Sequence, residues 1–239
     1  MACQSLLSVL CIRQAKLEKC IHQSFTGGID MSYLKAFVSA ILAGISIGFG
    51  GLVFLSVDNK VIGAALFTIG LFCICTFGFN LFTGKVCYAM QNRKEYAMKL
   101  PVIWLGNLVG TGLTAVCVLL TRNAAALSDK AMSICQIKTN DSYVSLFFLG
   151  LLCNTFIYIA VEGFKNNIHE TGKYLSLFFG VMAFVLSGTE HCVADMFYFW
   201  MAKDWSFRSI VSLFVITAGN IIGGIAVATL HKSIKQIEK

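Results

Sequence analysis

Residues 174–200 read YLSLFFGVMAFVLSGTEHCVADMFYFW, an apolar run that polar and ionisable residues interrupt once, within the stretch 187–195. The run is long enough for an α-helix that crosses about 30 Å of hydrocarbon. Backbone that is not helical is tolerated at this depth only where protein or a water-filled cavity covers it. The stretch therefore predicts a membrane helix that is broken beside a functional cavity.

Five further apolar runs of similar length accompany this one. They cover residues 33–57, 61–88, 101–121, 143–164 and 207–231. Because 57% of the chain is hydrophobic and only 13% is charged, it lacks the polar residues to cover a water-facing surface. The runs are too long and too uniformly apolar for the strands of a barrel. We therefore predict an all-α integral membrane protein with six transmembrane helices.

The pattern assigns residues 33–232 to one pore domain, residues 1–32 to an N-terminal segment and residues 233–239 to a tail. In the N-terminal segment, Leu6 and Ile21 share a helical face with other leucines, which predicts a helix lying on the membrane surface. Basic residues outside the spans predominate on the side of both termini, which predicts that both are cytoplasmic and that the protein lies in the cell membrane. The net charge of +7 is therefore attributed to membrane orientation rather than to nucleic-acid binding.

The ten cysteines are scattered and lack the paired spacing of metal ligands. They are interpreted as small buried apolar residues, because unpaired cysteine is among the most buried residue types. No metal and no cofactor are expected.

The chain also divides into two related halves of three spans each. The pairs that a shift of 106 positions superimposes include Thr83 with Thr189 and Lys85 with His191. In addition, the third span of each half carries Gly-Asn-x-x-Gly, at residues 106–110 and 219–223. Since each half has three spans, the second half enters the membrane with the opposite orientation, which is the inverted-repeat plan of many transporters.

In this plan the second span of each half is the broken one, so the second and fifth helices are predicted to face each other. The first interruption, residues 79–85, contains Thr83, which together with free backbone N–H groups can donate hydrogen bonds to an anion. The second interruption contains His191, a residue type that titrates near neutral pH when unperturbed. Glu190 beside it is interpreted either as part of the site or as a helix cap, and Lys85 either as pore-lining or as snorkelling to the interface.

Lys35 and Lys138 precede the first spans of the two halves, on opposite sides of the membrane. Lysines at such places often only anchor helix ends. This pair would also make both mouths of a pore attractive to anions.

Five stretches carry a resemblance to a known family. They are AGISIG at 43–48, LFTG at 81–84, LGLLCN at 149–154, SGTEHCVADMF at 187–197 and GNIIGG at 219–224. Together, and in this order, they resemble the formate/nitrite transporter family, which also includes hydrosulfide channels and lactate transporters. The resemblance covers nearly the whole chain.

The resemblance implies an aquaporin-like protomer, a homopentamer with one pore per subunit, and a central pair of His191 and Thr83 between two hydrophobic constrictions. It further implies that Asn154 and Asn220 support the centre, whereas Lys85 departs from the family pattern. The residues implied for the constrictions are Phe67, Leu71, Leu81, Phe82, Ile157 and Phe184, and those implied for the vestibules are Lys35 and Lys138.

The predicted function is passage of a small monovalent anion of the formate, nitrite or hydrosulfide class, or of its conjugate acid, with protonation near His191. A bare anion in an apolar constriction meets a desolvation cost on the order of tens of kcal/mol, whereas the neutral acid loses only a few hydrogen bonds. Expected partners are this anion, protons, membrane lipid and further copies of the chain.

Two alternatives come from other classes of protein. The first is a pore for ammonia or water, against which the basic mouth residues argue; the single proline, Pro101, also excludes paired Asn-Pro-Ala breaks. The second is an intramembrane enzyme that uses His191 with Glu190 or Asp195. No nucleophile motif or metal-spaced histidine pair accompanies these residues, so an enzyme is not expected.

Overall fold

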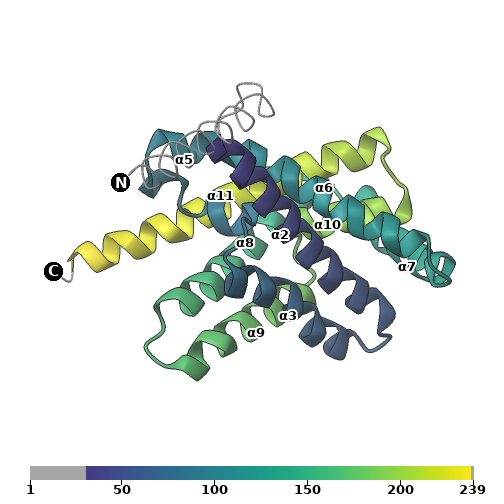
Figure 1. The fold of residues 1–239 in the computed structure, drawn as a ribbon, viewed down its shortest axis with the longest axis horizontal. Helices are drawn as coiled ribbons and strands as arrows, with labels where there is room; N and C mark the ends of the chain where they lie inside the picture. Colours follow the sequence, from purple (N-terminus) through teal and green to yellow (C-terminus); the bar gives the residue numbers. More distant parts are fainter. Residues whose placement is uncertain (1–30, 238–239) are drawn as a thin grey trace, which may run out of the picture. The chain divides into compact units, whose positions relative to one another are not determined.

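The computed structural model describes residues 31–237 and is helical over this range (Figure 1). Its helices are α2 (Met31–Ser56), α3 (Lys60–Phe77), α4 (Phe82–Val86), the 3-10 helix η1 (Ala89–Gln91), α5 (Lys94–Met98), α6 (Leu100–Leu119), α7 (Ala124–Asn140), α8 (Tyr143–Asn166), α9 (Glu170–Leu186), α10 (Cys192–Ala202) and α11 (Phe207–Ile237). The chain forms two compact units, Met1–Lys35 and Ala36–Lys239, and the arrangement described below is that of the second. The surface helix predicted between Leu6 and Ile21 lies outside the described residues.

The helices correspond to the six predicted spans. Within residues 31–237, five segments are long and apolar enough to cross a membrane. Four of them are the helices α2, α3, α8 and α11, and the fifth is the segment Lys94–Leu119, which includes α6. The sixth predicted span consists of two shorter helices, α9 and α10, separated by the predicted interruption.

Helix α7 was not among the predicted spans, because its sequence is only weakly apolar. Its buried residues are Leu127, Ala131, Cys135 and Lys138, and their spacing of three to four positions places them on one face of the helix. This face packs against α10. The spacing of these four residues is the sequence signal that could have identified the helix.

Both broken helices turn at a glycine in the left-handed conformation. Gly78 has φ 72° after α3, and Gly188 has φ 68° after α9. Side chains with a Cβ rarely adopt this conformation, so glycine is the residue that fits both turns. The first break therefore lies at residues 78–81, slightly earlier than predicted, and Thr83 already belongs to α4.

The two halves are related by a shift of 110 positions through these breaks, because Gly78 corresponds to Gly188. Backbone hydrogen bonds follow the same shift: the Asn80 N–H donates to Ser39 O and the Glu190 N–H donates to Leu149 O, each at 3.3 Å. The predicted superpositions of Thr83 with Thr189 and of Lys85 with His191 are therefore wrong. Sparse identities among apolar residues could not define the register, whereas the turn geometry does.

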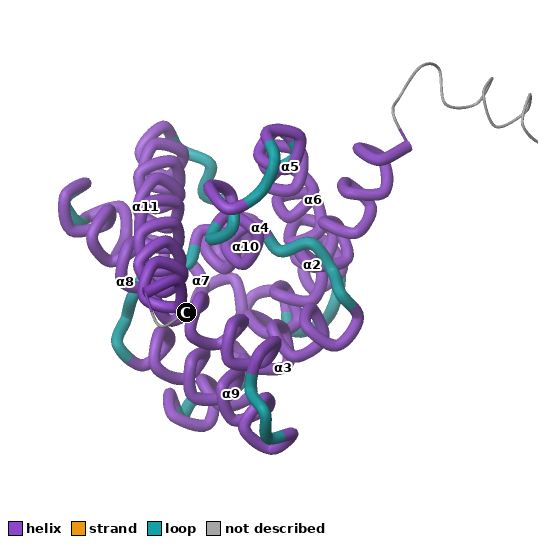
Figure 2. The backbone as a smooth tube through the Cα atoms, turned by 90° about the vertical axis from the view of Figure 1, so that its left-hand side faces the viewer, coloured by secondary structure: helices purple, strands orange, loops and turns teal. Residues whose placement is uncertain are grey.

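The short helices α4 and α10 lie inside the ring of longer helices in Figure 2. Helix α4 contacts α6, α8 and α11, and α10 contacts α6, α7 and α11. Helices α3 and α9, the outer parts of the two broken spans, lie side by side (Figure 1). This arrangement brings the two breaks together in the interior of the second unit.

The third span of each half approaches the first at its Gly-Asn motif. A Cβ on Gly110 would collide with the carbonyl oxygen of Ile41, and a Cβ on Gly223 would collide with that of Leu151. The glycines therefore let α6 and α11 approach α2 and α8 closely enough for the asparagine of each motif to reach the breaks.

Candidate functional site

The two breaks meet at a hydrogen bond between Thr83 and His191. Thr83 Oγ1 lies 2.9 Å from His191 Nε2, and both side chains are buried. Thr83 belongs to the first turn of α4, and His191 is the N-cap residue of α10. The structure therefore brings together the two residues that the sequence predicts at the centre, although they are separated by 108 positions.

The second nitrogen of His191 indicates which ring atom carries the proton. His191 Nδ1 accepts a hydrogen bond from the Ala194 N–H at 3.1 Å, as an N-cap side chain does. In a neutral imidazole one nitrogen accepts and the other donates, so this bond assigns the proton to Nε2. His191 then donates to Thr83 Oγ1, and the hydroxyl hydrogen of Thr83 remains available for another acceptor.

One asparagine holds each break. In the first half, the Phe82 N–H donates to Asn107 Oδ1 at 2.8 Å, and Asn107 Nδ2 donates to the Ala40 and Asn80 carbonyls at 2.8 and 3.0 Å. The broken backbone has lost helical partners here, and the amide replaces them. Asn107 lies in the Gly-Asn motif but was not among the predicted site residues.

Asn220 makes the corresponding three hydrogen bonds in the second half. The Cys192 N–H donates to its Oδ1 at 3.0 Å, and its Nδ2 donates to the Gly150 and Glu190 carbonyls at 2.7 and 2.9 Å. The repetition of the same three bonds identifies Asn107 and Asn220 as equivalent supports of the two breaks.

Asn154 supports the centre from α8. Its Nδ2 donates to the Thr83 carbonyl at 3.2 Å and to the Asn220 carbonyl at 2.7 Å. It therefore connects the α4 turn that carries Thr83 with the helix that holds the opposite break.

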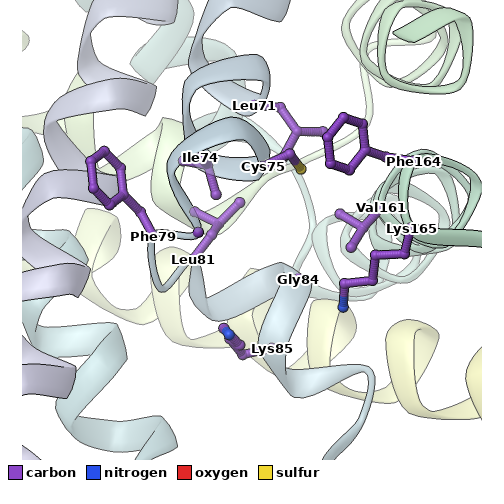
Figure 3. Close-up of a pocket in the computed structure, with 11 residues that line it drawn as sticks. Leu71, Ile74, Cys75, Phe79, Leu81, Gly84, Lys85, Val161, Phe164 and Lys165 are labelled. Carbon is purple, nitrogen blue, oxygen red and sulfur yellow. The ribbon is translucent and has the colours of Figure 1, made fainter. Parts of the chain in front are cut away.

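A cavity of about 120 Å³ is lined by residues of α3, α4 and α8 (Figure 3). We call it the α4 cavity. Its lining includes Leu71 and Leu81, two of the residues implied for the constrictions, together with Cys75, Lys85 and Lys165. Lys85 therefore borders this cavity, and its role as a pore-lining residue stays a prediction. Lys165 was not predicted, because a lysine at the end of a span resembles a helix anchor.

A second cavity, of about 240 Å³, lies on the α9–α10 side, and we call it the α10 cavity. His191 contributes to its lining, as do Phe67 and Phe184 from the predicted constrictions. The ring of Phe184 stacks on the His191 ring at a centroid distance of 5.5 Å and meets the Phe67 ring edge-on at 5.7 Å. Phe54, which was not predicted, extends this group by an edge contact with Phe67 at 6.4 Å.

The remaining two predicted constriction residues, Phe82 and Ile157, line neither cavity. Both side chains are buried, with exposed fractions of 4% and 2%. Their assignment to the constrictions stays a prediction.

Lys138 lines the α10 cavity together with two carboxylates. Its ammonium group forms an ion pair with Glu190 and a second with Asp195 Oδ1 at 3.0 Å, and all three residues are buried. Burial alone would lower the pKa of Lys138, but the two carboxylates raise it above its ordinary value. The charge of Lys138 is therefore offset by two carboxylates, and its predicted vestibule role stays a prediction.

Lys60 also borders the α10 cavity, where its Nζ donates to the Leu186 carbonyl at 3.4 Å. The formal charges of Lys60, Lys138, Glu190 and Asp195 cancel. Lys35, the other predicted vestibule residue, is exposed in the first turns of α2 and belongs to the unit Met1–Lys35. Its vestibule role stays a prediction.

Comparison with known proteins relates this chain to transporters of formate and nitrite. The profile of the family described as "Formate/nitrite transporter" matches residues 16–233. The nitrite transporter NirC of Salmonella typhimurium is 27% identical over 215 residues, which cover 80% of each chain. Formate-nitrite transporter 2 of Toxoplasma gondii is 29% identical over 232 residues, and the match spans 88% of this chain but only 49% of that longer protein.

Two solved structures share the fold. One is a pentameric formate channel with formate bound, at a TM-score of 0.73 and 26% sequence identity, with 87% of this chain and 98% of the other covered. The second is an ion channel described as belonging to the FNT family, at a TM-score of 0.73 and 27% identity, with coverage of 84% and 90%.

Proposed function

This chain belongs to the formate/nitrite transporter family, and from this premise we propose that it passes formate, nitrite or a similar small anion, or the conjugate acid, through a pore within each protomer. It is a multi-pass membrane protein and an anion channel of this family, not an enzyme. The choice of formate and nitrite follows the relatives named above, which include a nitrite transporter and a formate channel.

The hydrogen bond between Thr83 and His191 is the observation that carries the proposal. It lies where the two breaks meet, with the α4 cavity on one side and the α10 cavity on the other. A polar pair between two apolar constrictions suits a small solute that must exchange hydrogen bonds once, at the middle of its path. A sealed scaffold would have no use for these two buried polar groups or for the asparagines that position their backbone.

In the proposed mechanism the anion enters one cavity and becomes its neutral acid before it passes the apolar constriction. Leu71 and Leu81 form the constriction beside the α4 cavity, and Phe67 and Phe184 form the one beside the α10 cavity. The neutral acid avoids the desolvation cost of the bare ion. At the centre, the Thr83 hydroxyl donates a hydrogen bond to the solute.

His191 acts in this mechanism as a neutral donor that orients the Thr83 hydroxyl. Its Nδ1 is engaged by the Ala194 N–H, so a proton on Nδ1 would remove the cap of α10. The proton therefore comes from water in the cavities. This narrows the prediction from sequence, which placed the protonation near His191 without naming the proton donor.

The proposal extends to orientation and assembly. The excess of basic residues outside the spans on the side of both termini supports a cytoplasmic location of the two termini. In this orientation the α4 cavity opens toward the cytoplasm and the α10 cavity toward the outside. The similarity to a pentameric formate channel supports a homopentamer in the cell membrane, with one pore in each subunit.

The test is stopped-flow swelling of proteoliposomes in isosmotic sodium formate, sodium nitrite and sodium gluconate at two pH values. Swelling with formate and nitrite but not with gluconate is expected, and it should become faster at the lower pH, because a larger fraction of the anion is then present as its acid. Swelling no faster than that of empty liposomes would refute the proposed pore. Water permeability without anion flux would instead identify a neutral-solute pore.

A further inference from the structure

The α4 cavity combines two lysines with apolar walls. Lys85 projects from α4 and Lys165 from the last turn of α8, and Figure 3 shows the nitrogen atoms of both on the same side of Leu71, Ile74 and Leu81. Within residues 31–237, neither lysine is part of an ion pair with a carboxylate. Two like charges beside the same small cavity repel each other, and this repulsion is relieved by an anion that lies between them.

The backbone and side-chain contacts position both lysines. The Lys85 carbonyl accepts a hydrogen bond from the Tyr96 hydroxyl at 2.8 Å, which fixes the end of α4. The Lys165 ammonium group lies 4.1 Å from the centre of the Tyr88 ring, a cation–π contact. The first contact positions the backbone of Lys85, and the second positions the ammonium group of Lys165. Both contacts leave the N–H donors of the two ammonium groups available for a ligand.

Glu162, three positions before Lys165 on α8, has other partners. It accepts hydrogen bonds from Tyr88 at 2.7 Å and from Asn166 at 2.8 Å, and Lys235 Nζ lies 3.8 Å away. Glu162 therefore does not neutralise the α4 cavity in the way that Glu190 and Asp195 neutralise Lys138.

From these observations we infer that Lys85 and Lys165 form a binding subsite for a small oxyanion with two acceptor oxygens, that is, a short monocarboxylate or nitrite. Each ammonium group donates to one oxygen, an arrangement that a monatomic anion of the same charge cannot match. A volume of about 120 Å³ suits a ligand of a few heavy atoms. The subsite rests on the proposed function, since it names the substrate class of the same pore.

Cys75 provides a chemical probe of the subsite, because it lines the same cavity. Iodoacetate is itself a small carboxylate, and iodoacetamide is its uncharged analogue. In both reactions the Cys75 thiolate attacks the methylene carbon, a sulfur–carbon bond forms, the carbon–iodine bond breaks and iodide leaves. Tandem mass spectrometry of the purified full-length protein measures the two alkylation rates at Cys75, and Cys75→Ser confirms the assignment of the labelled peptide.

The ratio of the iodoacetate rate to the iodoacetamide rate is expected to be about tenfold higher in the wild type than in Lys85→Gln/Lys165→Gln. Formate and nitrite should protect Cys75 at concentrations about tenfold lower than chloride does. Lys232→Gln removes one exposed charge from α11 and should behave as the wild type. Should the double variant fail to fold, Lys165→Gln alone replaces it, since Lys165 is exposed.

Equal protection by formate and chloride, or a rate ratio unchanged in the lysine variants, would overturn the subsite. The outcome is distinguishable from failure of the proposed function. If formate drives swelling but formate and chloride protect Cys75 equally, the pore is supported and the subsite is refuted. If formate protects Cys75 better than chloride does but drives no swelling, the subsite is supported and the pore is refuted.

Discussion

The α4 cavity and the α10 cavity adjoin the same kind of helix break, but their lining residues carry different charges. Each adjoins a break that turns at a left-handed glycine and is held by three hydrogen bonds from one asparagine. The α4 cavity has two lysines without a carboxylate partner among the described residues. In the α10 cavity, the charge of Lys138 is offset by Glu190 and Asp195. The repeat therefore supplies the scaffold, and the residues that differ between the halves supply the electrostatics.

This difference separates two uses of a buried lysine. Lys138 holds α7 against α10 through its carboxylate partners, so its loss should damage the fold. Lys85 and Lys165 stabilise no partner of this kind, so their loss should alter ligand binding while the fold persists. The following predictions test this separation, beginning with the largest effect.

Replacement of Lys138 by methionine should destabilise the protein by about 3–5 kcal/mol, because it leaves Glu190 and Asp195 buried without a cation. The measurement is thermal unfolding of the detergent-purified protein, followed by size-exclusion chromatography. Lys85→Gln is the matched control and should change the stability by less than about 1 kcal/mol.

The triple variant Lys138→Met/Glu190→Gln/Asp195→Asn should recover most of the stability that Lys138→Met loses, since none of these three buried charges remains.

The raised pKa of Lys138 determines how its contribution to stability depends on pH. A group whose pKa is raised by folding contributes its full stability below its unfolded pKa of about 10.4, and this contribution decreases only above that pH. Because Lys138 stays charged at both pH values, its replacement should lower the free energy of unfolding by the same amount at pH 6 and at pH 8.

Replacement of Asn220 by leucine should cost about 3 kcal/mol, because a buried N–H and two carbonyls of the second break lose their partner. Asn107→Leu should cost a similar amount in the first break. Equal losses, measured by denaturant or detergent unfolding, would support the equivalence of the two breaks. A loss confined to one variant would show that the halves do not share this device.

His191→Asn should retain the fold, because asparagine is a good N-cap residue and can accept the Ala194 N–H. Formate flux should fall by about fivefold through loss of the hydrogen bond to Thr83, while the dependence of flux on pH keeps its wild-type shape. A changed pH profile in the proteoliposome assay would contradict the neutral-donor role and favour proton transfer through His191.

The smallest effect is expected at the turns. Gly78→Ala and Gly188→Ala place a Cβ on a left-handed residue, although neither Cβ would meet another atom within 4 Å. Each substitution should therefore lower the stability by about 1 kcal/mol through backbone strain alone. A much larger loss in one of them, seen as a lower midpoint of thermal unfolding, would reveal an additional constraint in that half.

Several parts of the pathway were predictable because a membrane makes polar residues conspicuous. An interrupted apolar run such as residues 174–200 leaves few interpretations, so the break and His191 follow from the sequence. The Gly-Asn motifs at residues 106–110 and 219–223 likewise marked the chain as two related halves. Lys165 and Phe54 were not predictable, since a lysine at a helix end and a phenylalanine in an apolar span are common in any membrane protein.

The sequence by itself determined the six spans, the two breaks and the pairing of Thr83 with His191 through its family resemblance. Only the tertiary structure decided the register of the repeat, the place of α7 and the ion pairs of Lys138. The physical reason is the range of the interactions. Hydropathy and breaks are properties of local sequence in a lipid solvent. The charge that a cavity presents depends instead on which distant residues meet there, as Lys138 meets Glu190 across 52 positions.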